Sequence, residues 1–355
     1  MATETFVHLH NHSDYSLLDG AQKTGDMAKR AAKYEQPALA LTDHGNMFGA
    51  VEFYQACVKQ GIKPIIGMEA YIAADRHNRT AERENKSYHM VLLARNETGY
   101  RNLVKLASAA YLEGFYYRPR IDREILSKYA DGLIGLSACM SGEPNFHLRS
   151  GNVAAAVEAA ATYRDILGQD YYYLEIQNHG IPEEERIRQL MPEVARQTGC
   201  PIIATNDCHF LDREHHEAHD ILMALQTGKT INDPSRWRSN TPEVYFKSSA
   251  EMLALFRDWP EACANTLRVA DQVDFKLELG KLLLPAFPLP EGFATADAYL
   301  THLARAGLAK RYGTITPELE ERLAYELGVI AQTGYAGYFL IVWDFIDASR
   351  RMNVP

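Results

Sequence analysis

Three histidines near the amino terminus stand at alternate positions, His8, His10 and His12, and a carboxylate follows at Asp19. Alternate residues of a strand share one face, so the three imidazoles would point the same way. Imidazole and carboxylate groups together bind zinc, manganese or iron. A solvated strand face can carry the same residues by chance, so this segment alone leaves a metal site and a polar surface both open. We expect His8 to be a neighbour of such a site rather than a ligand.

Metal-binding side chains recur where later apolar runs end. They are Asp43 and His44 after ALALT, Glu69 after KPIIGM, Cys139 after LIGLS, and Asp207 and His209 after PIIAT. Ligands of parallel sheets and barrels bind beyond the carboxyl ends of the strands. Five of the seven apolar runs therefore place such a side chain at the functional edge. His89 does not follow this rule, because it stands at the start of its run.

The apolar runs alternate with amphipathic stretches of helical period. The predicted strands are Phe6–His10, Ala38–Thr42, Pro64–Ile72, His89–Ala94, Leu133–Ser137, Tyr171–Ile176 and Pro201–Thr205. Alternation of strands and helices is typical of a parallel sheet with helices packed outside it. Seven strands fit either a barrel or an open sheet. No glycine-rich motif follows the first run, which argues against a dinucleotide-binding fold.

The pattern changes beyond residue 226. Ser248 and Glu251 have the spacing of a capping box, which predicts that a helix begins there. Three prolines in Leu282–Gly292 indicate a boundary, because proline cannot continue a helix or a central strand. We expect a first domain over residues 1–280 and the truncated beginning of a second, mostly helical domain over residues 281–355. The aromatic run Tyr335–Phe345 is expected to pack against a partner surface.

The composition is that of an ordinary globular protein, with 46% hydrophobic residues. A net charge of −9 provides no domain-wide basic surface, so any binding of nucleic acid must depend on a local group of residues or on metal ions. The 5 cysteines include no C-x-x-C pair, which favours a reducing, cytoplasmic setting. No apolar run approaches the roughly 20 residues of a membrane span, and we expect no membrane partner.

Several arginines could contact DNA phosphates, although solvated loop charges are the simpler interpretation. They are Arg76, Arg79 and Arg83 in a polar loop, and Arg118, Arg120, Arg236 and Arg238 elsewhere. His179 is a reserve candidate for metal binding. His215, His216 and His219 lie in a charged helical stretch and are expected to form a solvated face.

The candidate ligands together indicate a reaction class. If about three residues hold each ion, a cluster of this size could serve about three metals. Such clusters lower the pKa of a bound water and stabilise both oxygens of an in-line phosphoryl displacement. Hydrolysis of phosphate esters is the reaction that these residues favour.

Long ordered segments of the chain resemble a known family. The segments HLHNHSDYSLLDGA, ALTDHGNMFGAVEFY, GIKPIIGMEAYI, ETGYRNLVKLASAAYLEGFY and ATNDCHF are similar to the amino-terminal region of bacterial DNA polymerase III alpha subunits. That region is a polymerase-and-histidinol-phosphatase (PHP) domain. The final QTGYAGYFLIVWDFIDASRRMNVP resembles the start of the polymerase palm. The resemblance implies a distorted seven-stranded α/β barrel of PHP type, followed by the beginning of the palm.

The resemblance also implies a metal site, since every ligand position of the family carries a competent side chain here. The implied ligands are His10, His12, Asp19, His44, Glu69, His89, Cys139, Asp207 and His209. Glu69 is the implied bridging carboxylate, and Asp43 is expected to orient a histidine. The implied cofactors are two to three divalent metals, zinc first and manganese or iron as alternatives. Magnesium would serve a polymerase site outside this chain.

The implied activity is a metal-dependent 3′–5′ exonuclease that proofreads within a DNA-directed DNA polymerase. The implied partners are the DNA primer end, the rest of the polymerase chain, the sliding clamp, the clamp loader and a separate exonuclease subunit. Three alternatives stay open. They are a docking module with structural metals, a free-standing histidinol-phosphatase-like phosphoesterase, and an amidohydrolase-type enzyme that cleaves C–N bonds.

Overall fold

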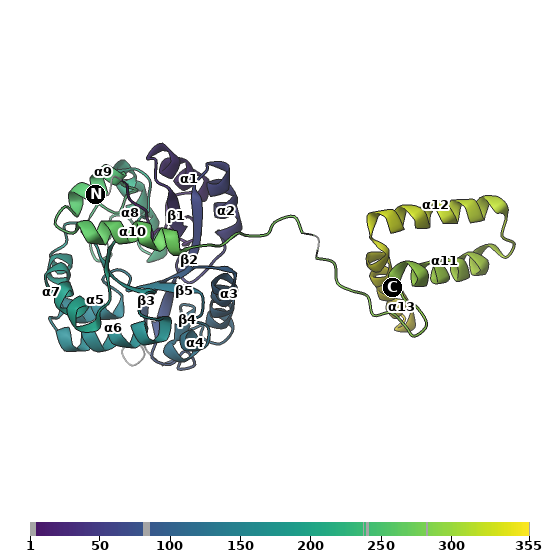
Figure 1. Ribbon diagram of the computed structural model, residues 1–355, viewed down its shortest axis with the longest axis horizontal. Helices are drawn as coiled ribbons and strands as arrows, with labels where there is room; N and C mark the ends of the chain where they lie inside the picture. Colours follow the sequence, from purple (N-terminus) through teal and green to yellow (C-terminus); the bar gives the residue numbers. More distant parts are fainter. Residues whose placement is uncertain (1–4, 81–85, 237, 239–240, 282, 355) are drawn as a thin grey trace. The chain divides into compact units, whose positions relative to one another are not determined.

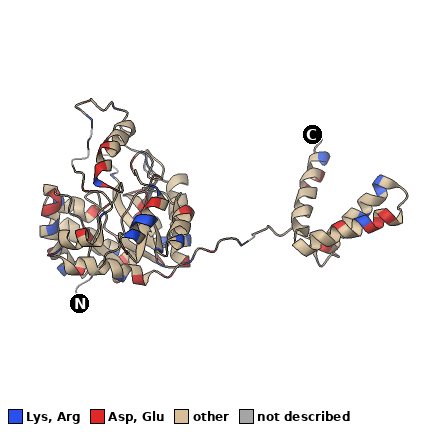
Figure 2. Ribbon diagram, turned by 90° about the horizontal axis from the view of Figure 1, so that it is seen from above, with Lys and Arg blue, Asp and Glu red and all other residues tan. Residues whose placement is uncertain are grey.

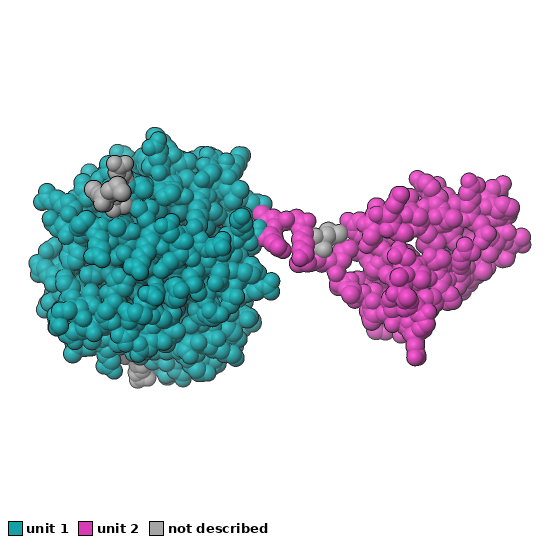
Figure 3. All heavy atoms as spheres, in the orientation of Figure 1, with its two compact units in different colours: residues 1–277 teal, residues 278–355 magenta. Residues whose placement is uncertain are grey.

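The computed structural model describes residues 5–80, 86–236, 238, 241–281 and 283–354. The chain forms two compact units, residues 1–277 and residues 278–355 (Figure 3). Lys and Arg are mixed with Asp and Glu along the helices of both units (Figure 2). This mixing agrees with the absence of a domain-wide basic surface expected from the composition.

The first unit is built on one curled sheet of seven strands, with helices on its outside (Figure 1). The strands are β1 Ala38–Leu41, β2 Lys63–Ala73, β3 Tyr88–Ala94, β4 Arg120–Asp122, β5 Leu133–Leu136, β6 Tyr172–Ile176 and β7 Ile202–Ala204. The strand order is β1-β2-β3-β5-β6-β7, and β4 pairs with β2. The seven-stranded α/β architecture of PHP type predicted from the sequence is confirmed.

The helices of the first unit lie before the first strand, between strands and after the last strand. They are α1 Thr24–Lys33, α2 Ala50–Lys59, α3 Glu97–Leu112, α4 Arg123–Lys128, α5 Glu143–Arg149, α6 Val153–Leu167, α7 Pro182–Thr198, α8 His216–Gln226, α9 Ser249–Leu255 and α10 Pro260–Gln272. The predicted capping box at the start of α9 is confirmed, because Ser248 Oγ accepts from the Glu251 backbone and Glu251 accepts from the Ser248 backbone.

The expectation of an all-parallel sheet is wrong for β3, which runs antiparallel to both β2 and β5. Parallel neighbours need a long crossover, usually a helix, and the described residues between β2 and β3 form none. The reversal pairs His89, at the start of β3, with Tyr71 near the carboxyl end of β2. His89 therefore lies at the same edge of the sheet as the residues that follow the parallel strands.

The segment Phe6–His10 was expected to be a strand, but it is an extended segment outside the regular ladders. The Ala40 N–H donates to His8 O at 3.0 Å on the β1 side of the segment. On the β7 side, the Cys208 N–H donates to His10 O at 3.2 Å. The Asn11 side chain donates hydrogen bonds to His8 O and Ala40 O, where a regular strand would have backbone-to-backbone hydrogen bonds. The segment thus bridges the two edges of the curled sheet.

The strands are buried on both faces, which explains why they read as continuous apolar runs. In β3, Met90 and Leu92 pack in one hydrophobic cluster, whereas Val91 and Leu93 pack in the other. The two clusters hold the sheet between them and fix the positions of the strand ends.

The described residues of the second unit form three helices, α11 Ala296–Tyr312, α12 Pro317–Thr333 and α13 Ala336–Arg351. Thr295 and Thr316 cap the first two helices through their side chains. Much of the predicted aromatic run is exposed within the unit, with Phe345 69% exposed. Among the described residues no single helix is long and apolar enough to cross a membrane. The pair α12 and α13, bent by 115° at the break between them, is long and apolar enough only when the two helices are taken together.

Asn11→Ala should lower the free energy of unfolding by about 1–3 kcal/mol, because it removes two buried hydrogen bonds that fasten the bridging segment. Urea titration of the chain measures this change. The exposed Gln55→Ala is the control and should change stability by less than about 0.5 kcal/mol. Equal stability of the two variants would contradict a fastening role for Asn11.

Candidate metal centre

A buried carboxylate, Glu69 of β2, lies at the centre of the candidate site. Its Oε1 lies 3.3 Å from His10 Nε2 and 2.9 Å from His89 Nδ1. Its Oε2 lies 3.4 Å from His12 Nε2 and 2.6 Å from His44 Nδ1. Four imidazoles from three separate segments therefore converge on one carboxylate.

A second carboxylate, Asp207, follows β7 and faces the same histidines. Its Oδ1 lies 3.0 Å from His12 Nε2 and 3.3 Å from His10 Nε2. The same oxygen lies 3.7 Å from His209 Nδ1. Asp207 and Glu69 thus approach His10 and His12 together.

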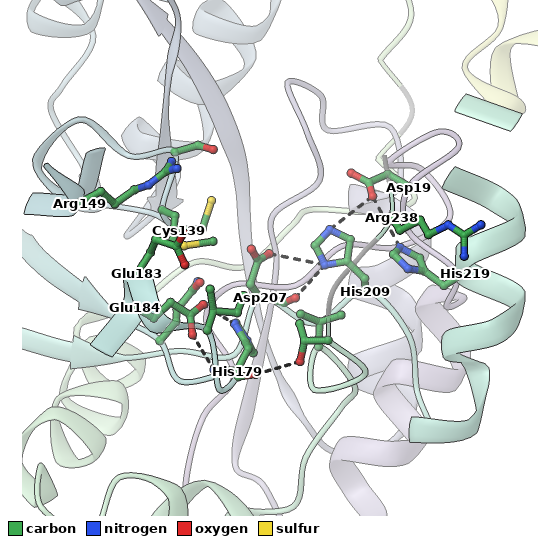
Figure 4. A pocket seen from close by; sticks show the side chains of 16 residues that line it. Asp19, Cys139, Arg149, His179, Glu183, Glu184, Asp207, His209, His219 and Arg238 are labelled. Atoms are coloured by element: carbon green, nitrogen blue, oxygen red, sulfur yellow. Dashed lines mark hydrogen bonds and ion pairs between the residues drawn. The ribbon is translucent and has the colours of Figure 1, made fainter. Parts of the chain in front are cut away.

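The third carboxylate, Asp19, joins the other side of the cluster. Its Oδ2 lies 2.8 Å from His44 Nε2, and its Oδ1 lies 3.6 Å from His209 Nε2. Figure 4 shows His209 between Asp207 and Asp19, and a dashed line joins Asp19 to His219. Two carboxylates therefore flank His209.

Cys139, which follows β5, completes the cluster. Its Sγ lies 3.9 Å from both Glu69 Oε1 and His89 Nδ1. Burial, followed by the nearby carboxylates, raises the pKa of this thiol well above its usual value. The structure brings all nine residues named in the sequence analysis into one connected cluster.

Several buried polar atoms of the cluster lie close to one another but make no hydrogen bond. Among the described residues these atoms include His10 Nε2, His12 Nε2, His44 Nδ1, Glu69 Oε2 and Asp207 Oδ1. A buried polar atom that makes no hydrogen bond is costly, and cations placed between these atoms would satisfy them. The donor set of imidazole, carboxylate and sulfur therefore fits divalent metal ions.

Three overlapping trios of ligand atoms lie within 4.8 Å of one another. They are His12, His44 and His209; His10, His12 and Glu69; and His44, Glu69 and His89. Each trio has the number of protein ligands that a catalytic zinc usually keeps. The shared members mean that metals held by the trios would be close neighbours.

Charges within the cluster favour ionised carboxylates. Burial alone would favour the neutral acid, but His89 and His44 hold the pKa of Glu69 well below its usual value. Burial likewise opposes protonation of His10, yet Asp207 and Glu175 raise its pKa well above the usual value. Burial lowers the pKa of His12 to about 3. Metal ions would compete with protons for the histidines, because ligands must be deprotonated.

Glu175, a residue that the sequence analysis missed, supports His10 from behind. It is fully buried in β6, and its Oε1 lies 2.7 Å from His10 Nδ1. Gln177 and Thr205 donate hydrogen bonds to the same carboxylate oxygen. A carboxylate behind an imidazole fixes the ring and raises its basicity. The only sequence signal was an acid inside an apolar run.

Asp43 is linked to His12 through a serine. Its carboxylate accepts hydrogen bonds from Ser13 and Ser16. Ser16 Oγ in turn lies 3.0 Å from His12 Nδ1. The His12 ring is thereby held with Nε2 toward the cluster.

Two other histidines, His8 and His179, have hydrogen-bond partners outside the cluster. His8 Nε2 lies 2.8 Å from Lys247 O, and burial lowers the pKa of His8 to about 4. Both ring nitrogens of His179 have protein partners, Glu184 and Asn206. Neither residue joins the cluster.

The expectation that His219 forms part of a solvated face is wrong. Its side chain is 3% exposed, and its Nε2 lies 3.7 Å from Asp19 Oδ1. The reason is that α8 packs this side of the helix inward, where Met223, one turn further on, is also buried. His219 is therefore a neighbour of the candidate centre.

Three of the seven arginines considered for DNA contacts are held by structural partners. Arg76 is buried and pairs with Asp122 and Glu113, which corrects its assignment to a solvated loop. Arg120 donates to backbone carbonyls, and Arg236 pairs with Asp220. Arg83 lies outside the described residues.

Two cavities flank the cluster. The first, about 390 Å³, is bordered by Asp19, Cys139, Asp207 and His209, with Arg149 and Arg238 on opposite sides (Figure 4). The second, about 830 Å³, is bordered by Asp19, His44 and His89, with Arg118 and several aromatic residues on its walls. A cavity therefore borders the cluster on each of two sides.

Comparison with known families finds two matches. Residues 8–179 match the PHP domain family. Residues 298–355 match the family described as bacterial DNA polymerase III alpha NTPase domain.

Curated relatives match along the whole chain. DNA polymerase III subunit alpha of Treponema pallidum (strain Nichols) is 44% identical over 359 residues, covering 100% of this chain and 30% of the relative. The Borreliella burgdorferi protein of the same name is 44% identical over 353 residues, covering 99% of this chain and 31% of the relative. The Thermus aquaticus protein of the same name is 41% identical over 415 residues, covering 98% of this chain and 34% of the relative. The chain thus spans about a third of the length of these relatives.

Glu69→Gln should lower the content of bound divalent metal, since it removes the charge on which four histidines converge. Metal analysis of the purified chain measures the content. Chelator should lower the melting temperature of the unaltered chain, because metals stabilise the folded state that binds them, and should change that of the variant far less. The exposed Glu124→Gln is the matched control. Equal metal content in both variants would contradict the central role of Glu69.

Glu175→Gln should weaken metal binding about 10-fold to 100-fold without abolishing it, because residues behind a metal ligand contribute in this range. Titration of the metal-free protein with zinc measures the affinity. An unchanged affinity would mean that Glu175 only fills the core.

Proposed function

This chain belongs to the family of DNA polymerase III alpha subunits, and from this membership we propose that its first unit is a metal-dependent 3′–5′ exonuclease. In this proposal it hydrolyses DNA phosphodiesters and removes misincorporated nucleotides from a primer end. The activity would serve proofreading within a DNA-directed DNA polymerase.

The convergence of four imidazoles on Glu69 carries the proposal. A carboxylate with histidines at both oxygens suits a bridge between metal ions. Divalent metals, when bound, would lower the pKa of water and stabilise the charge on a phosphoryl group. The chain's own residues would hold the ions and orient the imidazoles. Glu175 would orient the His10 ring, and Ser16 would orient the His12 ring.

We propose two to three metals, with the nine residues as ligands. Zinc is favoured by the mixture of imidazole, carboxylate and thiol donors, and manganese or iron are alternatives. The magnesium ions of polymerisation would bind elsewhere in the longer protein.

We further propose that residues 281–355 begin the polymerase palm and that the protein works in the cytoplasm on a DNA primer end. The remainder of the polymerase chain, the sliding clamp, the clamp loader and a separate exonuclease subunit are the partners that the family suggests. This part of the proposal rests on the curated relatives, of which the chain spans about a third.

Asp207→Asn should reduce 3′–5′ trimming of a labelled primer by about 100-fold or more, because it removes a carboxylate that faces His10 and His12. Gel analysis of a 5′-labelled, 3′-mismatched primer measures trimming, with and without chelator. Asp258→Asn, an exposed aspartate, is the matched control and should trim normally. Bound metal without chelator-sensitive trimming in the unaltered chain would refute the exonuclease and favour a docking module with structural metals.

A further inference from the structure

The larger cavity beside the metal centre carries exposed aromatic side chains. Phe48, Tyr111 and Tyr117 border it and are 60%, 40% and 78% exposed. Its volume of about 830 Å³ lies within the roughly 300–1,000 Å³ range of sites that bury small ligands. We call this cavity the aromatic groove.

A cation links the aromatic groove to the candidate ligands. The Arg118 guanidinium lies 5.0 Å from the centre of the Tyr71 ring, a cation–π distance. The Tyr71 ring in turn lies 5.9 Å from the His44 ring and 5.0 Å from the His89 ring. The groove therefore leads from exposed aromatic rings past a positive charge to the cluster.

Tyr117 has an unusual backbone. Its φ of 58° lies in the left-handed region, where a bulky side chain is an outlier. Strain of this kind collects at functional sites. Here it presents an aromatic ring to solvent beside Arg118, which core packing does not explain.

The charges of the two cavities differ. Asp19 is the one carboxylate among the described residues that border the aromatic groove. The smaller cavity is bordered by four carboxylates, Asp19, Asp207, Glu183 and Glu184, and by two arginines, Arg149 and Arg238. Its carboxylates outnumber its arginines, whereas the aromatic groove has one of each. A polyanion would therefore be repelled less in the aromatic groove.

We propose that the aromatic groove binds the unpaired 3′-terminal segment of a DNA strand and leads it into the metal centre. The bases stack on Phe48, Tyr111 and Tyr117, and Arg118 pairs with a backbone phosphate. Aromatic rings bind every base through its π face, and a nearby cation tracks the backbone, so the site accepts any sequence. This inference rests on the proposed exonuclease and names the form of its substrate.

The test measures binding apart from cleavage. A 5′-labelled phosphorothioate oligothymidylate, which resists hydrolysis, is titrated with the chain and followed by fluorescence anisotropy. Phe48→Ala and Tyr117→Gly should each weaken binding about tenfold. Arg118→Gln should weaken it and lower the slope of log affinity against log salt by about 0.7. Leu112→Ala, which removes an exposed apolar residue of α3 outside the groove, should leave the affinity unchanged.

A melting curve separates binding from folding for Tyr117→Gly. Glycine relieves the left-handed strain, so the melting temperature should stay level or rise while affinity falls. Unchanged strand affinity in all three groove variants would overturn the proposal. The proposal would also be overturned if the variants bound the strand normally but no longer bound the separately added remainder of the polymerase, because the groove would then be a docking site for protein. Strand binding through the groove without trimming of ordinary DNA would refute the exonuclease alone.

Discussion

The burial of one carboxylate among four imidazoles is the constraint on which the rest of the first unit depends. Removing an isolated carboxylate from water costs several kcal/mol unless opposite charges or metals offset it. Glu69 is 1% exposed, and its partners come from the bridging segment, the end of β1 and the start of β3. The sheet must therefore curl until these segments meet, and the two apolar clusters hold it in that shape.

The rule that ligands follow the carboxyl ends of strands located most of this arrangement from the sequence. It applied to His44 and Asp207 because they follow parallel strands, whose ends meet at one edge. It did not explain His89, because strand direction is not encoded in an apolar run. The reversal of β3 depends on the connection before it, and only the pairing of His89 with Tyr71 shows that the start of this strand lies at the ligand edge.

Residues behind the ligands were harder to predict, because their roles depend on partners far away in the sequence. Glu175 and His10 are 165 positions apart, and an acid within an apolar run does not reveal which ring it supports. His219 belongs to a charged helix, and its burial depends on which face α8 turns inward. Arg76 looked like a loop charge because its partner Asp122 lies in β4, a strand too short to recognise.

Backbone conformation gives an independent view of the same centre. Six described residues other than glycine have a positive φ, and Leu18, Ala138 and Asp207 are among them. Leu18 and Ala138 directly precede the candidate ligands Asp19 and Cys139, whereas Asp207 is itself a candidate. Left-handed backbone is unfavourable for such residues and persists where the surroundings over-determine it. The chain adopts it at the points where a candidate ligand is turned toward the cluster. Stability alone would favour glycine at these positions, so the geometry of the centre accounts for the strain better than packing does.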